Sequence, residues 1–202
     1  MIEAVPRAGL AAASLVALAA CVAEPEAPAP QLDEAAVLAA SLPVAQAFQA
    51  ELKAQLQAAI EAGGPKGGVS VCQQAAPAIA AAQSQASGAE VRRVAEKHRN
   101  PAGGVPMDLR EAYAMLAARP LVEGKPNRLV VQTGSGSDAR VHFLSAIPMQ
   151  EQPCSVCHGT QVEPALREHI EQLYPGDLAT GFQPGALRGA LVVSWDAAKF
   201  LE

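Results

Sequence analysis

A pair of cysteines followed directly by a histidine constrains this chain more than any other feature. Cys154 and Cys157 are separated by two residues, and His158 comes next. Thiols three positions apart lie on one helical turn, so both can reach vinyl groups of the same porphyrin. The imidazole after them then lies under the iron as its proximal ligand. This C-x-x-C-H pattern predicts a c-type haem, and because it occurs once, one covalently bound haem c.

Two other uses of such a cysteine pair fit the surroundings less well. A thioredoxin-type dithiol would follow a strand and open a long helix, whereas Pro148, Pro153 and Gly159 crowd this motif. A structural zinc site would need a second pair of cysteine or histidine ligands, which the sequence does not offer. Haem attachment is therefore the preferred interpretation.

The first 32 residues have the pattern of an exported and tethered protein. Arg7 precedes an apolar stretch that ends in small residues before Cys21, and the stretch is too short to cross a membrane. We expect a lipoprotein signal peptide over residues 1–20 and lipidation of Cys21; an ordinary secretory signal is the alternative. A Pro- and Ala-rich tether follows over residues 21–32. Val22 favours the outer over the inner membrane, so the predicted location is periplasmic and membrane-anchored.

One further cysteine, Cys72, has no partner thiol in such a mature chain. It is either a buried, inert side chain or a metal ligand, and the haem iron has a second axial position. Several methionines and histidines compete for that position: Met107, Met115, Met149, His98, His142 and His169. The sequence leaves this choice open, as it does a vacant iron position.

Charge and length limit the possible partners. The 202 residues carry a net charge of −5, and no basic patch with interleaved aromatic residues suggests nucleic acid. Residues 33–202 suffice for one domain with a sizeable core. A local basic cluster either binds the haem propionates or forms a solvated charged face: Arg92, Arg93, Lys97 and Arg99.

Apolar periodicity and turn residues predict an α+β domain. We expect a long N-terminal helix capped by Asp33, kinked or divided at Pro43 and ended at residues 63–65, then a second helix beginning near Gln73. Strands are expected over residues 91–95, 128–133, 139–147 and 188–195, and helices over residues 108–118, capped by Asp108, and 162–173. Strand 128–133 and strand 139–147 should form a hairpin.

Five segments together resemble a family of PAS-like monohaem c domains found in exported and membrane-bound bacterial sensor proteins. They are Val71-Cys72 with Ala76-Pro77; Val91-Arg92-Arg93; Arg99-Asn100-Pro101; the haem motif with Gly159; and Tyr174-Pro175 with Asp177, Ala179, Gly181 and Arg188-Gly189-Ala190. The resemblance implies a PAS-like antiparallel sheet with a long N-terminal helix and flanking helices around one haem c. It also implies that Cys72 is the distal iron ligand. Ala102-Gly103-Gly104 departs from the family, which commonly has an asparagine soon after the proline.

Three functions are compatible with these features, and the iron's second ligand separates them. A Cys/His pair keeps the reduction potential low and suits haem-based redox or ligand sensing through a protein partner. A low-potential electron-transfer cytochrome is the alternative, since it needs no output domain after Glu202. A peroxidase would need an open iron and a positioned distal acid–base group, which adjacent His98 and Arg99 are poorly placed to form. We therefore expect no enzymatic activity.

Overall fold

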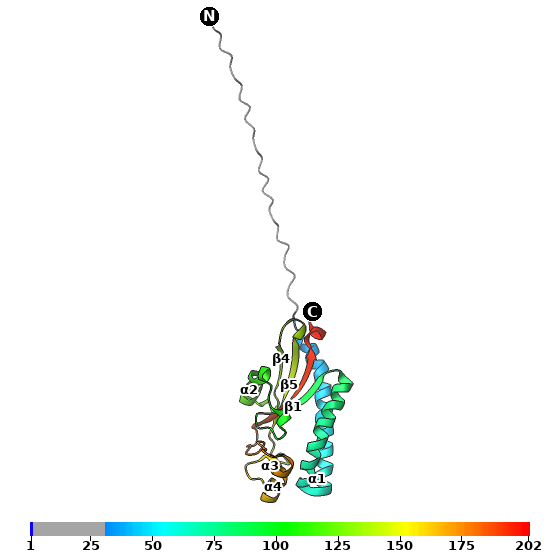
Figure 1. The fold of residues 1–202 in the computed structure, drawn as a ribbon, viewed down its shortest axis with the longest axis vertical. Coiled ribbons are helices and arrows are strands. Elements are labelled where there is room, and N and C mark those ends of the chain that lie inside the picture. The colour runs from blue at the N-terminus through cyan, green and yellow to red at the C-terminus, as the bar shows by residue number, and fades with distance from the viewer. Residues whose placement is uncertain (2–30) are drawn as a thin grey trace.

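A computed structural model of the protein describes residues 31–202 together with Met1. The predicted signal peptide, Cys21 and most of the tether lie outside the described residues. The first and last of the remaining residues pair with each other: Leu32 bridges Leu201, and the Gln31 amide donates to the Glu202 carbonyl. We call this part of the molecule the terminal end. It is the upper end of the coloured ribbon in Figure 1, beside the label C.

A helical hairpin forms one side of the molecule. Helix α1 (Glu34–Ser87) begins at Asp33, whose carboxylate accepts from the Ala36 amide, as predicted. The helical backbone is broken only at Gly63 and Gly64, and the two arms, residues 34–62 and 65–87, lie side by side (Figure 1). By length and composition α1 would suffice to cross a membrane, but its buried residues pack inside this domain.

The hairpin departs from expectation at two prolines. The first arm is not divided at Pro43, because the loss of one backbone hydrogen bond does not outweigh its packing through Val37, Ala45 and Phe48. The second arm begins at Pro65 rather than near Gln73, so that Pro77 lies inside it. Proline suits the first turn of a helix because its missing N–H would be unpaired there, and Pro65 takes that role.

Four antiparallel strands form the sheet, in the order β1-β6-β5-β4. They are β1 (Glu90–Val94), β4 (Arg128–Thr133), β5 (Arg140–Pro148) and β6 (Leu187–Asp196). The predicted strands and the 128–147 hairpin are confirmed. A two-stranded ribbon, β2 (Leu121–Val122) and β3 (Lys125–Pro126), lies outside this sheet.

The sheet is covered on both faces, and alternate residues of each strand serve different cores. Phe143, Leu191 and Val193 pack towards α1, whereas Leu144, Ala190 and Val192 pack towards α2 (Arg110–Ala118) through Leu109, Tyr113 and Leu116. Asp108 does not cap α2, because a 3-10 turn over Met107–Leu109 comes first; its carboxylate accepts from Thr133 instead.

The opposite end of the molecule holds the short helix α3 (Cys154–His158), helix α4 (Pro164–Leu173) and the turn of α1 (Figure 1). We call it the cavity end.

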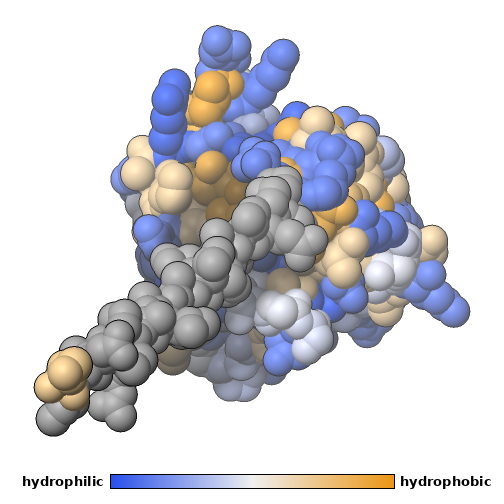
Figure 2. Space-filling view, turned by 90° about the horizontal axis from the view of Figure 1, so that it is seen from above, coloured by the Kyte–Doolittle hydropathy of each residue, from blue (hydrophilic) through white to orange (hydrophobic). Residues whose placement is uncertain are grey.

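Viewed instead from the terminal end, hydrophilic side chains surround scattered apolar ones (Figure 2). The described fold is thus α+β, with a long N-terminal helix and an antiparallel sheet, as the sequence predicts.

Candidate haem site

The C-x-x-C-H motif forms the single-turn helix α3, which brings its two thiols and its imidazole to one cavity. Cys154 packs against Met149, Ala179 and Phe182, while Cys157 packs on the other side with Val69 and Val162. A parallel bridge between Gly159 and Phe182 joins the end of α3 to the loop 177–182. The amide of Phe182 donates to the His158 carbonyl at 3.0 Å. The motif is therefore held from several sides.

The contacts of His158 leave one ring nitrogen free to ligate a metal. Its Nδ1 lies 2.7 Å from the Ala179 carbonyl. A carbonyl oxygen can only accept, so Nδ1 carries the proton and Nε2 keeps its lone pair. Burial, reinforced by the charges of Arg188 and Arg99, lowers the pKa of His158 well below its usual value. The imidazole is thus neutral, as a metal ligand must be.

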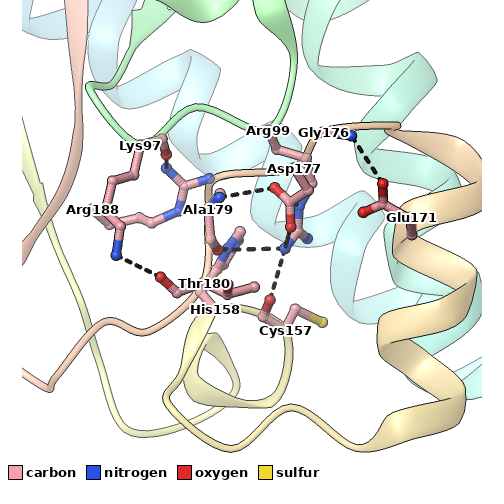
Figure 3. A network of polar contacts seen from close by, with 10 residues as sticks. All are labelled: Lys97, Arg99, Cys157, His158, Glu171, Gly176, Asp177, Ala179, Thr180 and Arg188. Atoms are coloured by element: carbon pink, nitrogen blue, oxygen red, sulfur yellow. Dashed lines mark hydrogen bonds and ion pairs between the residues drawn. The ribbon is translucent and has the colours of Figure 1, made fainter.

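The side chain of Arg99 connects the backbone segments on either side of this imidazole (Figure 3). Its Nε and Nη2 donate to the two carboxylate oxygens of Asp177 at 3.1 and 3.0 Å, and Nη2 also donates to the Cys157 carbonyl at 2.8 Å. Asp177 in turn accepts from the Ala179 amide at 2.9 Å. The chain Cys157–Arg99–Asp177–Ala179–His158 therefore closes on itself and fixes the orientation of the ring.

The cavity lies between both arms of α1, the end of β1, the end of β5, the start of β6 and α3. Its volume is about 520 Å³, within the range of roughly 300–1,000 Å³ that small-molecule and cofactor sites occupy. Four basic side chains contribute to its walls: Lys53, Arg93, Arg99 and Arg188. Among the described residues no carboxylate lines it. A protein of net charge −5 thus encloses a cationic cavity, which suits an anionic ligand.

The arginines of the predicted propionate cluster are separated by the structure. Arg93 lines the cavity, and burial lowers the pKa of its guanidinium, an effect that Cys72 partly offsets. Arg92 is on the opposite face of β1, outside the cavity walls, because side chains alternate along a strand; it pairs with Glu90 at 3.5 Å. Lys97 donates to the Thr180 carbonyl at 2.7 Å.

Arg188 was not singled out as a site residue by the sequence analysis. It is 9% exposed and lines the cavity beside Gly189. Burial, reinforced by Arg93 and Arg99, lowers its pKa to about 9. A signal was present in the sequence: a single arginine at the start of the apolar run Leu187–Trp195, with no acidic residue beside it.

Cys72 lines the same cavity from the second arm of α1. The thiol is half-buried, and desolvation raises its pKa, opposed by the three arginines of the cavity. Neighbouring residues anchor this segment to α4: Ser70 lies 3.4 Å from His169 Nε2, and Gln73 donates to the Leu173 carbonyl at 3.0 Å. The second arm therefore holds Cys72 against the part of the chain that follows the motif.

Only two of the competing ligands share the cavity. Met149, 2% exposed, and His98 are among its lining residues. His142 lies on the sheet between the hydroxyls of Thr133 and Ser194, and His169 contacts Ser70. Met107 and Met115 are 81% and 54% exposed and do not line the cavity.

These residues fit a c-type haem by the chemistry of their donors. The two thiols match the covalent attachment of the porphyrin, and the neutral imidazole matches the proximal iron ligand. The thiol of Cys72 offers a sulfur donor for the second axial position of the iron. Leucine and isoleucine side chains of the first arm supply apolar walls for a macrocycle. The cationic side chains match two propionate carboxylates.

Comparison with known proteins agrees with the resemblance seen in the motifs. The model of the Tll0287-like family, described as Tll0287, matches residues 26–195. The chain belongs to the Tll0287-like family. Among solved structures it is similar to the cyanobacterial heme-protein Tll0287, with 25% identity and a TM-score of 0.55, over 80% of this chain and 93% of that one. A search of curated proteins finds no match. The resemblance to this haem-domain family is thus confirmed.

Proposed function

We propose that this chain is a periplasmic, lipid-anchored protein with one haem c, acting in haem-based redox or ligand sensing. The observation that carries the proposal is the C-x-x-C-H motif opening into a cavity that is cationic, free of carboxylates among the described residues, and faced by Cys72. The solved relative is itself described as a heme-protein. We also assign the sheet to the PAS-like type that the resemblance implies.

Cys154 and Cys157 would hold the haem through thioether bonds, with His158 as proximal and Cys72 as distal ligand. The bound haem would supply one-electron chemistry and an exchangeable iron position. His158 is supported in this role by its free Nε2. Cys72 is supported by its place in the same cavity and by the three arginines that favour its thiolate. A thiolate stabilises ferric iron, so we expect a low reduction potential.

A sensor and a carrier would use this site differently. Detachment of the Cys72 sulfur on reduction would open the iron to a small gas, and the link from Ser70 and Gln73 to α4 would carry the change outward. A low-potential electron-transfer cytochrome would keep both ligands throughout. The attachment of the Cys72 segment to α4 favours the sensor, because it couples a movement of the sulfur to a neighbouring helix.

Anchoring through Cys21 would leave the cavity end accessible. The tether joins the domain at the terminal end, where the Asp33 amide donates to the Phe200 carbonyl. The motif and α4 lie at the other end of the molecule (Figure 1). A redox or signalling protein could therefore approach the cavity end from the side away from the membrane. We expect this membrane to be the outer membrane.

Electron paramagnetic resonance of the oxidised holoprotein tests the ligand pair. We expect Cys72→Ala to abolish the low-spin thiolate signal, while Met149→Leu, a change at another residue of the cavity wall, preserves it. An unchanged spectrum in Cys72→Ala would remove this sulfur from the iron. Carbon monoxide added to the reduced protein then separates the two functions, because a sensor shifts its Soret band and a permanently six-coordinate carrier does not.

A further inference from the structure

Arg188 carries a polar group that the described chain leaves unsatisfied. Its Nε is buried and has no hydrogen-bond partner among residues 31–202. Its Nη1 reaches only the Lys97 carbonyl, at 3.4 Å, and its guanidinium carbon lies 5.3 Å from the Phe182 ring centroid. A buried donor without a partner destabilises the fold, and more so when it is charged. The Nε/Nη2 edge is therefore available to a ligand that accepts two hydrogen bonds.

A β-bulge places this side chain in the cavity. Ile147 pairs with Gly189 and Pro148 pairs with Leu187, so Arg188 has no partner on β5. A bulge bends its strand and re-aims the extra residue, and bulges of this kind are common beside functional sites. Arg188 consequently lines the cavity, even though the rest of β6 is a regular and buried strand.

The surrounding charges call for an anion. Arg93 and Arg99 are close enough to Arg188 to disfavour its charge. Asp177, the carboxylate whose charge acts on Arg188, is already bound to the side chain of Arg99 and to the Ala179 amide. Arg93 forms no side-chain hydrogen bond within the described residues. Two guanidinium groups of the cavity thus remain without a counter-charge.

The chemistry of the proposed haem indicates which anion they meet. The vinyl groups bonded by Cys154 and Cys157 are at one edge of the porphyrin, and both propionates are at the opposite edge. Figure 3 shows the Cys157 sulfur and the Arg188 side chain on opposite sides of His158. We propose that the Nε/Nη2 edge of Arg188 binds a haem propionate as a bidentate carboxylate contact, with Arg93 balancing the remaining charge. This inference rests on the proposed function and deepens it.

Resonance Raman spectra and potentiometry of the holoprotein test this contact. We expect Arg188→Gln to shift the haem propionate bending band and to make the reduction potential more negative, because a nearby cation favours ferrous iron. Arg188→Lys retains the charge without the two-pronged edge, so it should shift the band while keeping the potential close to that of the wild type. Arg92→Gln is the matched control, because Arg92 pairs with Glu90 outside the cavity walls and its loss should leave both readings unchanged.

The possible results separate three situations. A propionate band that stays in place in both Arg188 variants, with haem still attached, would overturn the proposal and reduce Arg188 to a remote charge. A band that moves equally in Arg92→Gln would also overturn it. If the wild-type protein carries no covalent haem after cytochrome maturation, the proposed function itself fails. The Lys variant keeps the test valid even where the Gln variant does not fold.

Discussion

The two ends of this molecule differ in how completely the polar groups of the chain find hydrogen-bond partners and opposite charges within it. At the terminal end, Trp195 Nε1 donates to Ser41 Oγ at 2.9 Å, and the Trp195 ring meets Phe200 edge-on at 5.8 Å. At the cavity end, Arg188 has an unpartnered donor and the walls carry cations without described carboxylates. The terminal end needs only the chain, whereas the cavity end has the features of a site that a ligand completes.

The largest expected effect is loss of the ligand. In Cys154→Ala/Cys157→Ala, which cannot attach haem, we expect amides of α3 and the loop 177–182 to exchange up to about a thousandfold faster, since a tightly bound ligand contributes about 4 kcal/mol. Amides near Trp195 in β6 should keep their protection. Hydrogen–deuterium exchange of both proteins measures this, and an equal loss of protection at the two ends would contradict the comparison.

The second effect concerns the buried ion pair of the cavity end. Asp177→Asn removes the carboxylate that Arg99 holds, and both side chains are buried, at 10% and 4% exposure. We expect the free energy of unfolding to fall by about 3 kcal/mol, because an uncompensated guanidinium stays buried. Chemical denaturation of the holoprotein measures it.

The exposed pair of Arg92 and Glu90 provides the control for Asp177→Asn. Glu90→Gln should cost no more than about 0.5 kcal/mol, since an exposed ion pair is screened by water and salt. Comparable losses in Asp177→Asn and Glu90→Gln would show that Arg99 does not hold the motif in place.

The sequence predicted local features better than those that depend on tertiary packing. Strands with alternating or continuous apolar residues, the Asp33 cap and the break at Gly63–Gly64 were confirmed, because each is determined within a few residues. Pro43 and Asp108 were misjudged, since packing against the sheet and a preceding 3-10 turn outweighed local preference.

The candidate site divides in the same way. The C-x-x-C-H motif and Cys72 were identifiable from residue type and spacing, and the structure brings them to one cavity. The role of Arg188 depends on a bulge between β5 and β6. The ion pair of Arg99 depends on Asp177, 78 residues away in the sequence. An arginine at the start of an apolar run marks Arg188 as unusual, but only the fold shows what Arg188 and Arg99 contact.

A smaller effect is expected at the terminal end. Ser41→Ala removes the only acceptor recorded for Trp195 Nε1 among the described residues, and Ser41 is fully buried. We expect a loss of about 1–2 kcal/mol in the free energy of unfolding, with or without haem, because an indole donor is left unpaired. Denaturation of the two forms measures it, with exposed Ser137→Ala as the control. A loss confined to the holoprotein would contradict the independence of the two ends.

The smallest effect is a pH dependence located in the sheet. Burial lowers the pKa of His142, which lies between Thr133 and Ser194, each at 2.8 Å. The unfolded chain then binds a proton at higher pH than the folded chain, so the stabilising contribution is complete above about pH 6.5 and is lost as the pH falls below it. His142→Gln should flatten the stability profile between about pH 7 and 5. An unchanged slope would contradict this assignment.

The mass of the intact protein, produced with a cytochrome-maturation system and denatured before measurement, tests the central claim most directly. We predict one covalently added haem in the wild-type chain and none in Cys154→Ala/Cys157→Ala. A wild-type chain with no added mass would contradict the claim that the cavity end is built around haem c.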